Sequence, residues 1–122
     1  MKNQKGMGQR GEELAVKYLK DKGFQILDRN WSFQKKELDI IAVEGEQLVV
    51  VEVKSRSTPE FEHPLDAIDL RKIRNIVHAT QAYIDLRDID LEVRFDVVAV
   101  LWKKREEYSI KHIREAFIAP VD

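Results

Sequence analysis

The sequence predicts an α/β domain with a mixed sheet flanked by helices, in the element order α-β-β-β-α-β-β. Two stretches carry apolar residues at helical spacing, several shorter runs alternate, and one segment, 95–101, is almost continuously apolar. One helix precedes a meander of three strands and the second crosses back to a further strand, unlike a βαβ nucleotide-binding unit. No glycine-rich phosphate loop is present, so nucleotide-triphosphate chemistry has no support.

Length and composition indicate one folded domain, 1–122, with a core that needs no covalent staples. Apolar residues make up 43% and charged residues 35%, the balance of a folded, strongly charged protein and not of a disordered chain. The absence of cysteine excludes disulfides and thiolate-bound zinc, and without a signal-peptide pattern the expected compartment is the cytoplasm. No apolar run approaches membrane-spanning length, so no membrane is expected among the partners.

Net charge gives no overall attraction to nucleic acid, because 21 Lys and Arg residues nearly balance 22 Asp and Glu residues. Basic residues nevertheless cluster at 35–36, 54–56, 71–74 and 103–105. A single cluster is more often a solvated face than a phosphate site, so a nucleic-acid surface requires several of them to converge in the fold.

The first helix is expected over 8–22. Its buried stripe consists of Leu14, Ala15, Tyr18 and Leu19. Gly11 lies near the centre of this stripe, which indicates a close approach of helix to sheet. Glu12 falls at the edge of the stripe, where core meets solvent, and Gly23 is the expected C-cap.

A strand at 24–31 and a hairpin of 37–43 and 48–56 follow. Gly45 and Glu46 are expected to form a two-residue turn, because glycine supplies the backbone angles that such a turn needs. After a loop at 57–64, a long helix is expected to open at Pro64 and run to residue 86. Strands at 95–101 and 108–113 complete the sheet.

The hairpin register brings two acidic side chains together. With the two-residue turn, Asp39 faces Glu52 and Glu37 faces Lys54. Two carboxylates directly opposite on one sheet face repel each other unless a cation lies between them. Mg²⁺ or Mn²⁺ suits such oxygen ligands, and a nearby lysine suits phosphodiester hydrolysis. The structural alternative is an ordinary Glu37–Lys54 ion pair across the strands.

Several motifs along the chain point to one superfamily. They are G-x-x-G-E-x-x-A (Gly8 to Ala15), I-L-D-R-N (Ile26 to Asn30), E-L-D-I-I-A (37–42), V-V-V-E-V-K-S-R (49–56), Lys72 and R-F-D-V-V (Arg94 to Val98). Together they resemble the PD-(D/E)xK restriction-endonuclease-like superfamily, and within it the YraN-like family of small bacterial proteins, relatives of archaeal Holliday-junction resolvases. The resemblance implies a restriction-endonuclease-like αβββαβ core.

The resemblance also implies roles for individual residues. Asp39 and Glu52 correspond to the metal ligands, with the Val53 carbonyl as a third oxygen. Lys54 corresponds to the catalytic lysine, and Glu12 to a first-helix glutamate that lies near the metals in related nucleases. The implied cofactor is Mg²⁺ or Mn²⁺.

Nucleic-acid contacts are expected from Lys72, Lys36 and Arg56. Lys72 matches a family lysine on the second helix, although a solvated helix lysine fits the sequence equally well. Lys36 stands where the family usually has glycine, and 61–64 departs from the family's F-G-x-P. Both departures concern the approach of the substrate and leave the expected ligands in place.

Aromatic and other polar candidates carry weaker signals. Trp31 and Phe33 beside the lysines at 35–36 suit stacking on an unpaired base, but a tryptophan at the end of a strand is more often core or cover, which we favour. His78 is expected to be partly buried and His112 to lie on an edge strand. Asp96, inside a buried strand, is expected to be an ion-pair or hydrogen-bond partner.

The expected function is therefore metal-dependent hydrolysis of phosphodiester bonds in DNA. The resemblance to resolvases implies branched or otherwise structured DNA as the substrate. Two cuts on such a substrate would favour a homodimer. Two alternatives remain open. One is a noncatalytic DNA-binding protein that kept the fold, and the other is a protein-interaction adaptor that binds through its acidic segment 85–92 and its C-terminal tail.

Overall fold

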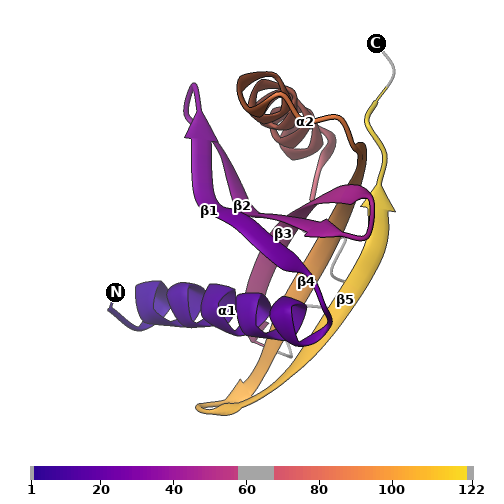
Figure 1. Cartoon of the computed structure of the whole chain (residues 1–122). Helices are drawn as coiled ribbons and strands as arrows, with labels where there is room; N and C mark the ends of the chain where they lie inside the picture. Colours follow the sequence, from indigo (N-terminus) through magenta and orange to yellow (C-terminus); the bar gives the residue numbers. More distant parts are fainter. Residues whose placement is uncertain (1, 58–67, 121–122) are drawn as a thin grey trace.

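A computed structural model of the chain describes residues 2–57 and 68–120, with only the backbone described for residues 2–7. In chain order the elements are α1 (Lys2–Asp21), β1 (Gln25–Phe33), β2 (Lys36–Glu44), β3 (Gln47–Ser57), α2 (Leu70–Arg87), β4 (Glu92–Lys104) and β5 (Glu107–Phe117). The strands form a five-stranded sheet in sequence order, and α1 and α2 pack against opposite faces of it (Figure 1). The predicted α/β class is confirmed.

The sheet is mixed, as expected. β3 and β4 run parallel, with α2 as the crossover between them, and every other neighbouring pair is antiparallel. The order α1, β1 to β3, α2, β4 agrees with the αβββαβ nuclease-like core that the resemblance implies. None of the helices in the described part of the chain is long and apolar enough to cross a membrane.

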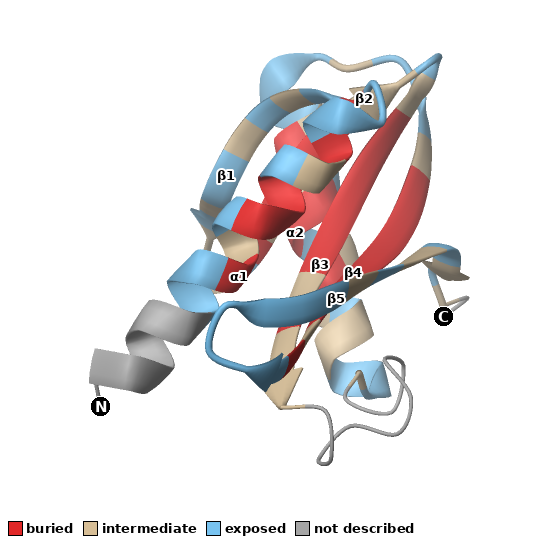
Figure 2. Ribbon diagram, turned by 90° about the horizontal axis from the view of Figure 1, so that it is seen from below, coloured by how far each residue is buried: buried red, intermediate tan, exposed pale blue. Residues whose placement is uncertain are grey.

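Each helix covers one face of the sheet. The α1 face is filled by Ala15, Val16, Leu19, Phe24, Ile40, Ala42, Val49, Val51 and Val98. The α2 face is filled by Leu38, Ile41, Leu48, Val50, Ile76, Ala79, Tyr83 and Phe95. Residues of β3 alternate between the two lists because successive strand side chains point to opposite faces. β3 and β4 are consequently buried along most of their length (Figure 2).

The starts of the two helices differ from prediction in opposite directions, because α1 begins at Lys2, before the predicted Gly8, and α2 begins later than predicted. At the C-terminal end of α1, Gly23 has φ of +95° and the N–H of Phe24 donates to the Leu19 carbonyl at 3.0 Å, so the predicted cap is confirmed. α2 begins at Leu70. Asp69 is its N-cap, because its side chain accepts the Lys72 N–H at 2.9 Å.

The predicted start at Pro64, the loop at 58–64 and the departure at 61–64 lie outside the described residues. The strands themselves are longer than the apolar pattern predicts. β4 and β5 extend to residues 104 and 107 because pairing continues into the charged ends of the hairpin, up to the turn. Backbone pairing does not require apolar side chains, so composition underestimates strand length there.

The β2–β3 hairpin has the predicted register. Glu44 pairs with Gln47 across a two-residue turn in which Gly45 has φ of +60°. The predicted alternation fails near the other end, where Leu38 packs on the α2 face with Ile41. In the described structure, the part of β2 before Ile40 pairs with β1 and not with β3. Pairing with β3 therefore does not determine which face of the sheet the side chains of this part take.

Candidate metal centre

β2 and β3 separate at the point where the predicted carboxylates lie. Their ladder ends at the pair Ile40 and Val51. The preceding residue of β2, Asp39, instead uses its side chain, and its Oδ2 accepts the N–H of Val53 at 2.8 Å. The N–H and C=O of one strand residue point to the same edge, so the Val53 carbonyl faces the same gap between the strands.

Glu52 lies beside this gap with two lysines at one of its oxygens. Its side chain is buried and projects toward α2, as alternation along β3 requires. Lys54 Nζ lies 3.3 Å from Glu52 Oε2, and Lys72 Nζ from α2 lies 3.4 Å from the same atom. Lys54 is therefore held by Glu52. Glu37 is exposed, so the simple Glu37–Lys54 ion pair does not account for the position of this lysine.

The two carboxylates are electrostatically coupled. The pKa of Asp39 is raised from 3.8 to about 7, first because burial removes the carboxylate from water and then because the Glu52 carboxylate lies close to it. The Val53 N–H and the Lys72 ammonium lower the pKa but do not compensate. Near neutral pH this pair favours an additional proton or cation between its oxygens.

The donor set fits a hard divalent cation. It offers carboxylate oxygens from Asp39 and Glu52 and the backbone oxygen of Val53. Among the described residues, no three His, Cys, Asp or Glu side chains form a metal-binding group. Mg²⁺ and Mn²⁺ suit a site of this kind, because Mg²⁺ keeps several waters and binds through one or two carboxylates, whereas Ca²⁺ takes more protein oxygens.

Glu12 lies on the far side of the β1–β2 hairpin. Its Oε1 accepts from Asn30 Nδ2 at 2.8 Å and from Arg29 Nη2 at 3.2 Å. The register of β1 on β2 places Asn30 across from Asp39. In the described structure Glu12 is thus connected to the site through β1 and not through a contact with either predicted ligand, a link that the helical pattern of α1 alone does not reveal.

The three predicted nucleic-acid residues all lie on the α2 side. Lys72 contacts Glu52, as described above. Lys36 at the start of β2 places its Nζ 2.6 Å from Nδ1 of His78 on α2. Arg56, two residues after Lys54 and therefore on the same face, turns its guanidinium to the Ser55 carbonyl at 2.9 Å. The fold thus brings basic residues from β2, β3 and α2 to the same side of the sheet as Glu52.

His78 is exposed, so the prediction that it is partly buried is wrong. The buried stripe of α2 consists of Ile76, Ala79, Thr80 and Tyr83. His78 lies outside this stripe. Sequence analysis also missed that the hydroxyl of Tyr83 donates to Asp28 at 2.8 Å, a contact across 55 positions that only the fold creates. Burial and this aspartate raise the pKa of Tyr83 to about 12.

Asp96 is an internal anchor, as predicted. It receives two hydrogen bonds of 2.9 Å from Arg94, and His112 Nε2 lies 2.8 Å from its Oδ2. Burial raises the pKa of Asp96, but the hydrogen bonds of His112 and Arg94 outweigh burial and leave it below its usual value. His112 is on the edge strand β5, as expected, and its Nδ1 lies 3.2 Å from the Tyr18 hydroxyl. This network ties β4 and β5 to α1.

Comparison with known sequences identifies a family that covers most of the chain. The family model described as uncharacterised protein family UPF0102 matches residues 11–100, which include all the residues discussed at the gap. A UPF0102 protein of Parabacteroides distasonis is 48% identical over 120 residues, covering 98% of both chains. A UPF0102 protein of Flavobacterium psychrophilum is 47% identical over 111 residues, covering 91% of this chain and 92% of the relative.

Proposed function

This chain belongs to the UPF0102 family, and we propose that it is a nucleic-acid-binding protein that hydrolyses phosphodiester bonds in structured DNA with Mg²⁺ or Mn²⁺. Membership in the family confirms the YraN-like resemblance of the sequence. The observation that carries the proposal is the pair Asp39 and Glu52 at the separation of two strands, with the pKa of Asp39 raised to about 7. A fold maintained for stability alone gains nothing from a half-buried carboxylate, Asp39, next to a buried one, Glu52.

In this proposal, Asp39, Glu52 and the Val53 carbonyl hold the cation. When bound, it supplies a Lewis acid that polarises a phosphate oxygen and lowers the pKa of a coordinated water. Lys54 is nearly buried, so its ammonium interacts strongly with negative charge that develops on the phosphate. Its 3.3 Å contact with Glu52 keeps that ammonium at the gap.

Substrate contacts are assigned to the basic side chains around the gap. Lys72 is 43% exposed while its Nζ lies at Glu52, so it faces both the site and solvent. This position suits a phosphate next to the scissile bond. Lys36 and Arg56 add further positive charge on the same side of the sheet. Glu12 supports β1 next to Asp39 through its hydrogen bond to Asn30.

Cleavage of a labelled four-way DNA junction, with a linear duplex for comparison, tests the proposal. The wild-type protein is expected to cut in Mn²⁺, and Asp39→Asn to lower the rate by about 100-fold or more, the loss typical of removing a group that stabilises transition-state charge. Glu37→Gln is the matched control, because it removes an exposed carboxylate from the same strand. A homodimer is expected to nick both strands in one binding event.

The outcomes separate the alternatives. If the wild-type protein and the variants all bind the junction but none of them cuts it, the result supports the alternative of a noncatalytic DNA-binding protein. Cutting that survives Asp39→Asn contradicts the assignment of this site.

A further inference from the structure

The β1–β2 hairpin carries a run of aromatic rings that the metal site does not use. Trp31 and Phe33 are parallel to within 4°, with centroids 6.3 Å apart. Trp31 meets Tyr83 edge to face at 5.1 Å, and Phe33 meets His78 edge to face at 5.9 Å. The hairpin rises beside α2 in Figure 1, so the run bridges the two elements.

One end of this run is anchored and the other reaches solvent. Tyr83 is 1% exposed and its hydroxyl is bonded to Asp28, which fixes the inner end. Trp31 and Phe33 are half-buried, and His78 at the outer end is exposed. Aliphatic side chains would fill the space between the hairpin and α2 equally well. Aromatic rings that reach solvent offer, in addition, a flat surface on which another ring can stack.

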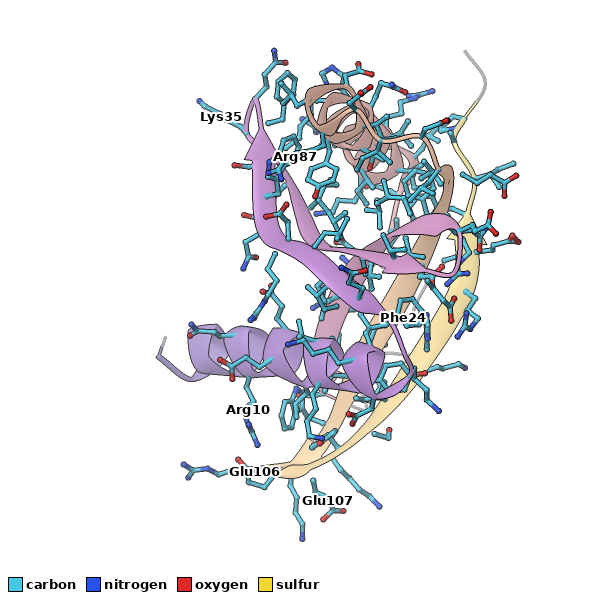
Figure 3. All side chains as sticks on the ribbon, viewed as in Figure 1. Arg10, Phe24, Lys35, Arg87, Glu106 and Glu107 are labelled. Carbon is cyan, nitrogen blue, oxygen red and sulfur yellow. The ribbon has the colours of Figure 1, made fainter. Side chains whose placement is uncertain are left out.

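The surroundings of the outer end are basic. Gln34 and Lys35 form a two-residue turn, both with positive φ, 51° and 67°. Lys35 extends outward from the tip of the hairpin (Figure 3), and Lys36 contacts His78 at 2.6 Å. Arg74, four residues before His78 on α2, is exposed on the same side of the helix. Planar rings flanked by cations match a nucleobase with phosphates on either side of it.

The position of the rings relative to the metal centre is also defined. Lys36 precedes Asp39 by three residues of one strand, a span of about 10 Å. That span equals about three stacked nucleotide steps of about 3.4 Å. A base at the hairpin and a phosphate at Asp39 therefore lie within the reach of one short nucleic-acid strand.

We propose that Trp31, Phe33 and His78, with Lys35 and Lys36, form a subsite that stacks one unpaired nucleobase of the substrate, about three nucleotides from the phosphate at the metal centre. This inference rests on the proposed function. A base inside a duplex is already stacked on both sides, so the subsite selects DNA with an unpaired position near the cut.

The test uses a forked DNA duplex in EDTA, so that binding is measured without cleavage. One version carries the fluorescent base 2-aminopurine at the unpaired position, and a second is abasic there. The wild-type protein is expected to quench 2-aminopurine and to bind the base-containing fork about tenfold more tightly than the abasic one, in line with the contribution of one stacked base.

Three variants make the result specific. Phe33→Leu is expected to abolish both the quenching and the preference for the base. Lys35→Ala is expected to weaken binding of both forks equally, because it removes a phosphate contact. Tyr108→Leu, which removes an exposed aromatic ring on β5, is the matched control and is expected to change neither.

Equal affinity of the wild-type protein for both forks, or quenching that survives Phe33→Leu, overturns the subsite and leaves the hydrolysis proposal standing. Quenching and base preference without any Mn²⁺-dependent cleavage support the subsite while the hydrolysis proposal fails. Failure to bind either fork overturns both.

Discussion

The carboxylate of Asp39 is held in a position that disfavours its charged form. Burial and the Glu52 carboxylate raise its pKa, while its hydrogen bond from the Val53 N–H holds it in place between the strands. The folded chain without metal therefore bears an electrostatic cost at neutral pH, which a bound cation removes. We interpret this cost as the energetic signature of a binding site.

Replacement of Asp39 by asparagine should reveal that cost as a pH-dependent gain in stability. The folded pKa of about 7 lies above the unfolded value of 3.8, so between these values the folded state binds more protons. The free energy of unfolding of the wild-type protein therefore falls as pH rises from about 4 to about 7. Asp39→Asn, which keeps an acceptor for the Val53 N–H, should be more stable at pH 8 by on the order of 4 kcal/mol.

Urea denaturation in EDTA from pH 4 to pH 8 measures this difference. The difference between the two proteins is expected to become small near pH 4, where Asp39 is protonated in the folded chain and about half protonated in the unfolded chain. The lowered pKa of Asp96 affects both proteins alike and cancels. A constant difference across the range would show that Asp39 does not carry the predicted pKa.

At the scale of elements, the contact of α1 with β3 sets the position of the strand that carries the site. A Cβ added at Gly11 would lie 2.7 Å from Ser55 Oγ and 2.9 Å from Ser55 Cβ. Ser55 Oγ accepts the Trp102 indole N–H at 2.7 Å, so the serine is held from the other side as well. The helix therefore needs glycine at this point, as its place in the apolar stripe predicts.

Gly11→Ala is expected to lower the free energy of unfolding by about 1–2 kcal/mol, because overpacking of about 1–3 kcal/mol exceeds the gain in helix propensity of about 1 kcal/mol. Gly8→Ala is the matched control on the same helix, where an added Cβ meets nothing within 4 Å. It should leave stability unchanged or raise it by up to about 1 kcal/mol. Thermal unfolding of both variants checks the pair, and equal effects at the two positions would contradict the close approach.

The hairpin shows how far the sequence determines an element. Glycine at position 45 and the alternation on either side are enough to predict the turn and the register from Glu44 to Ile40. The separation beyond Ile40 is not predictable in this way, because it depends on a side chain of β2 replacing a backbone partner of Val53. Likewise, the start of α2 depends on the Asp69 cap, whereas apolar spacing continues on both sides of it.

At the scale of the whole molecule, a net charge of −1 means that any attraction to DNA must be local. The sequence shows the basic clusters but not that Lys36, Arg56 and Lys72 share one side of the sheet. That arrangement comes from the parallel β3–β4 pairing and the α2 crossover. The likeness to nucleases predicts the ligand types, whereas the partners of Glu12 and His78 arise from contacts between distant segments.

Salt dependence of DNA binding follows from this local charge. Each of Lys36, Arg56 and Lys72 is assigned one phosphate, so methionine at any of them should reduce the slope of log affinity against log salt by about 0.9 on duplex DNA. Arg105→Met, at an exposed position on the β4–β5 turn, is the control and should leave the slope unchanged. Identical slopes for all four variants would place the nucleic-acid surface elsewhere.

The most direct test of the metal centre is calorimetric titration of Mn²⁺ into the wild-type protein, Asp39→Asn and Glu37→Gln at pH 7. We predict that the wild-type protein and Glu37→Gln bind Mn²⁺ with equal affinity and release protons, because the pKa of Asp39 is about 7. Asp39→Asn should bind at least about tenfold more weakly and without this proton release. Mn²⁺ binding of equal affinity in Asp39→Asn, or no Mn²⁺ binding by the wild-type protein, would contradict a metal centre at the separation of β2 and β3.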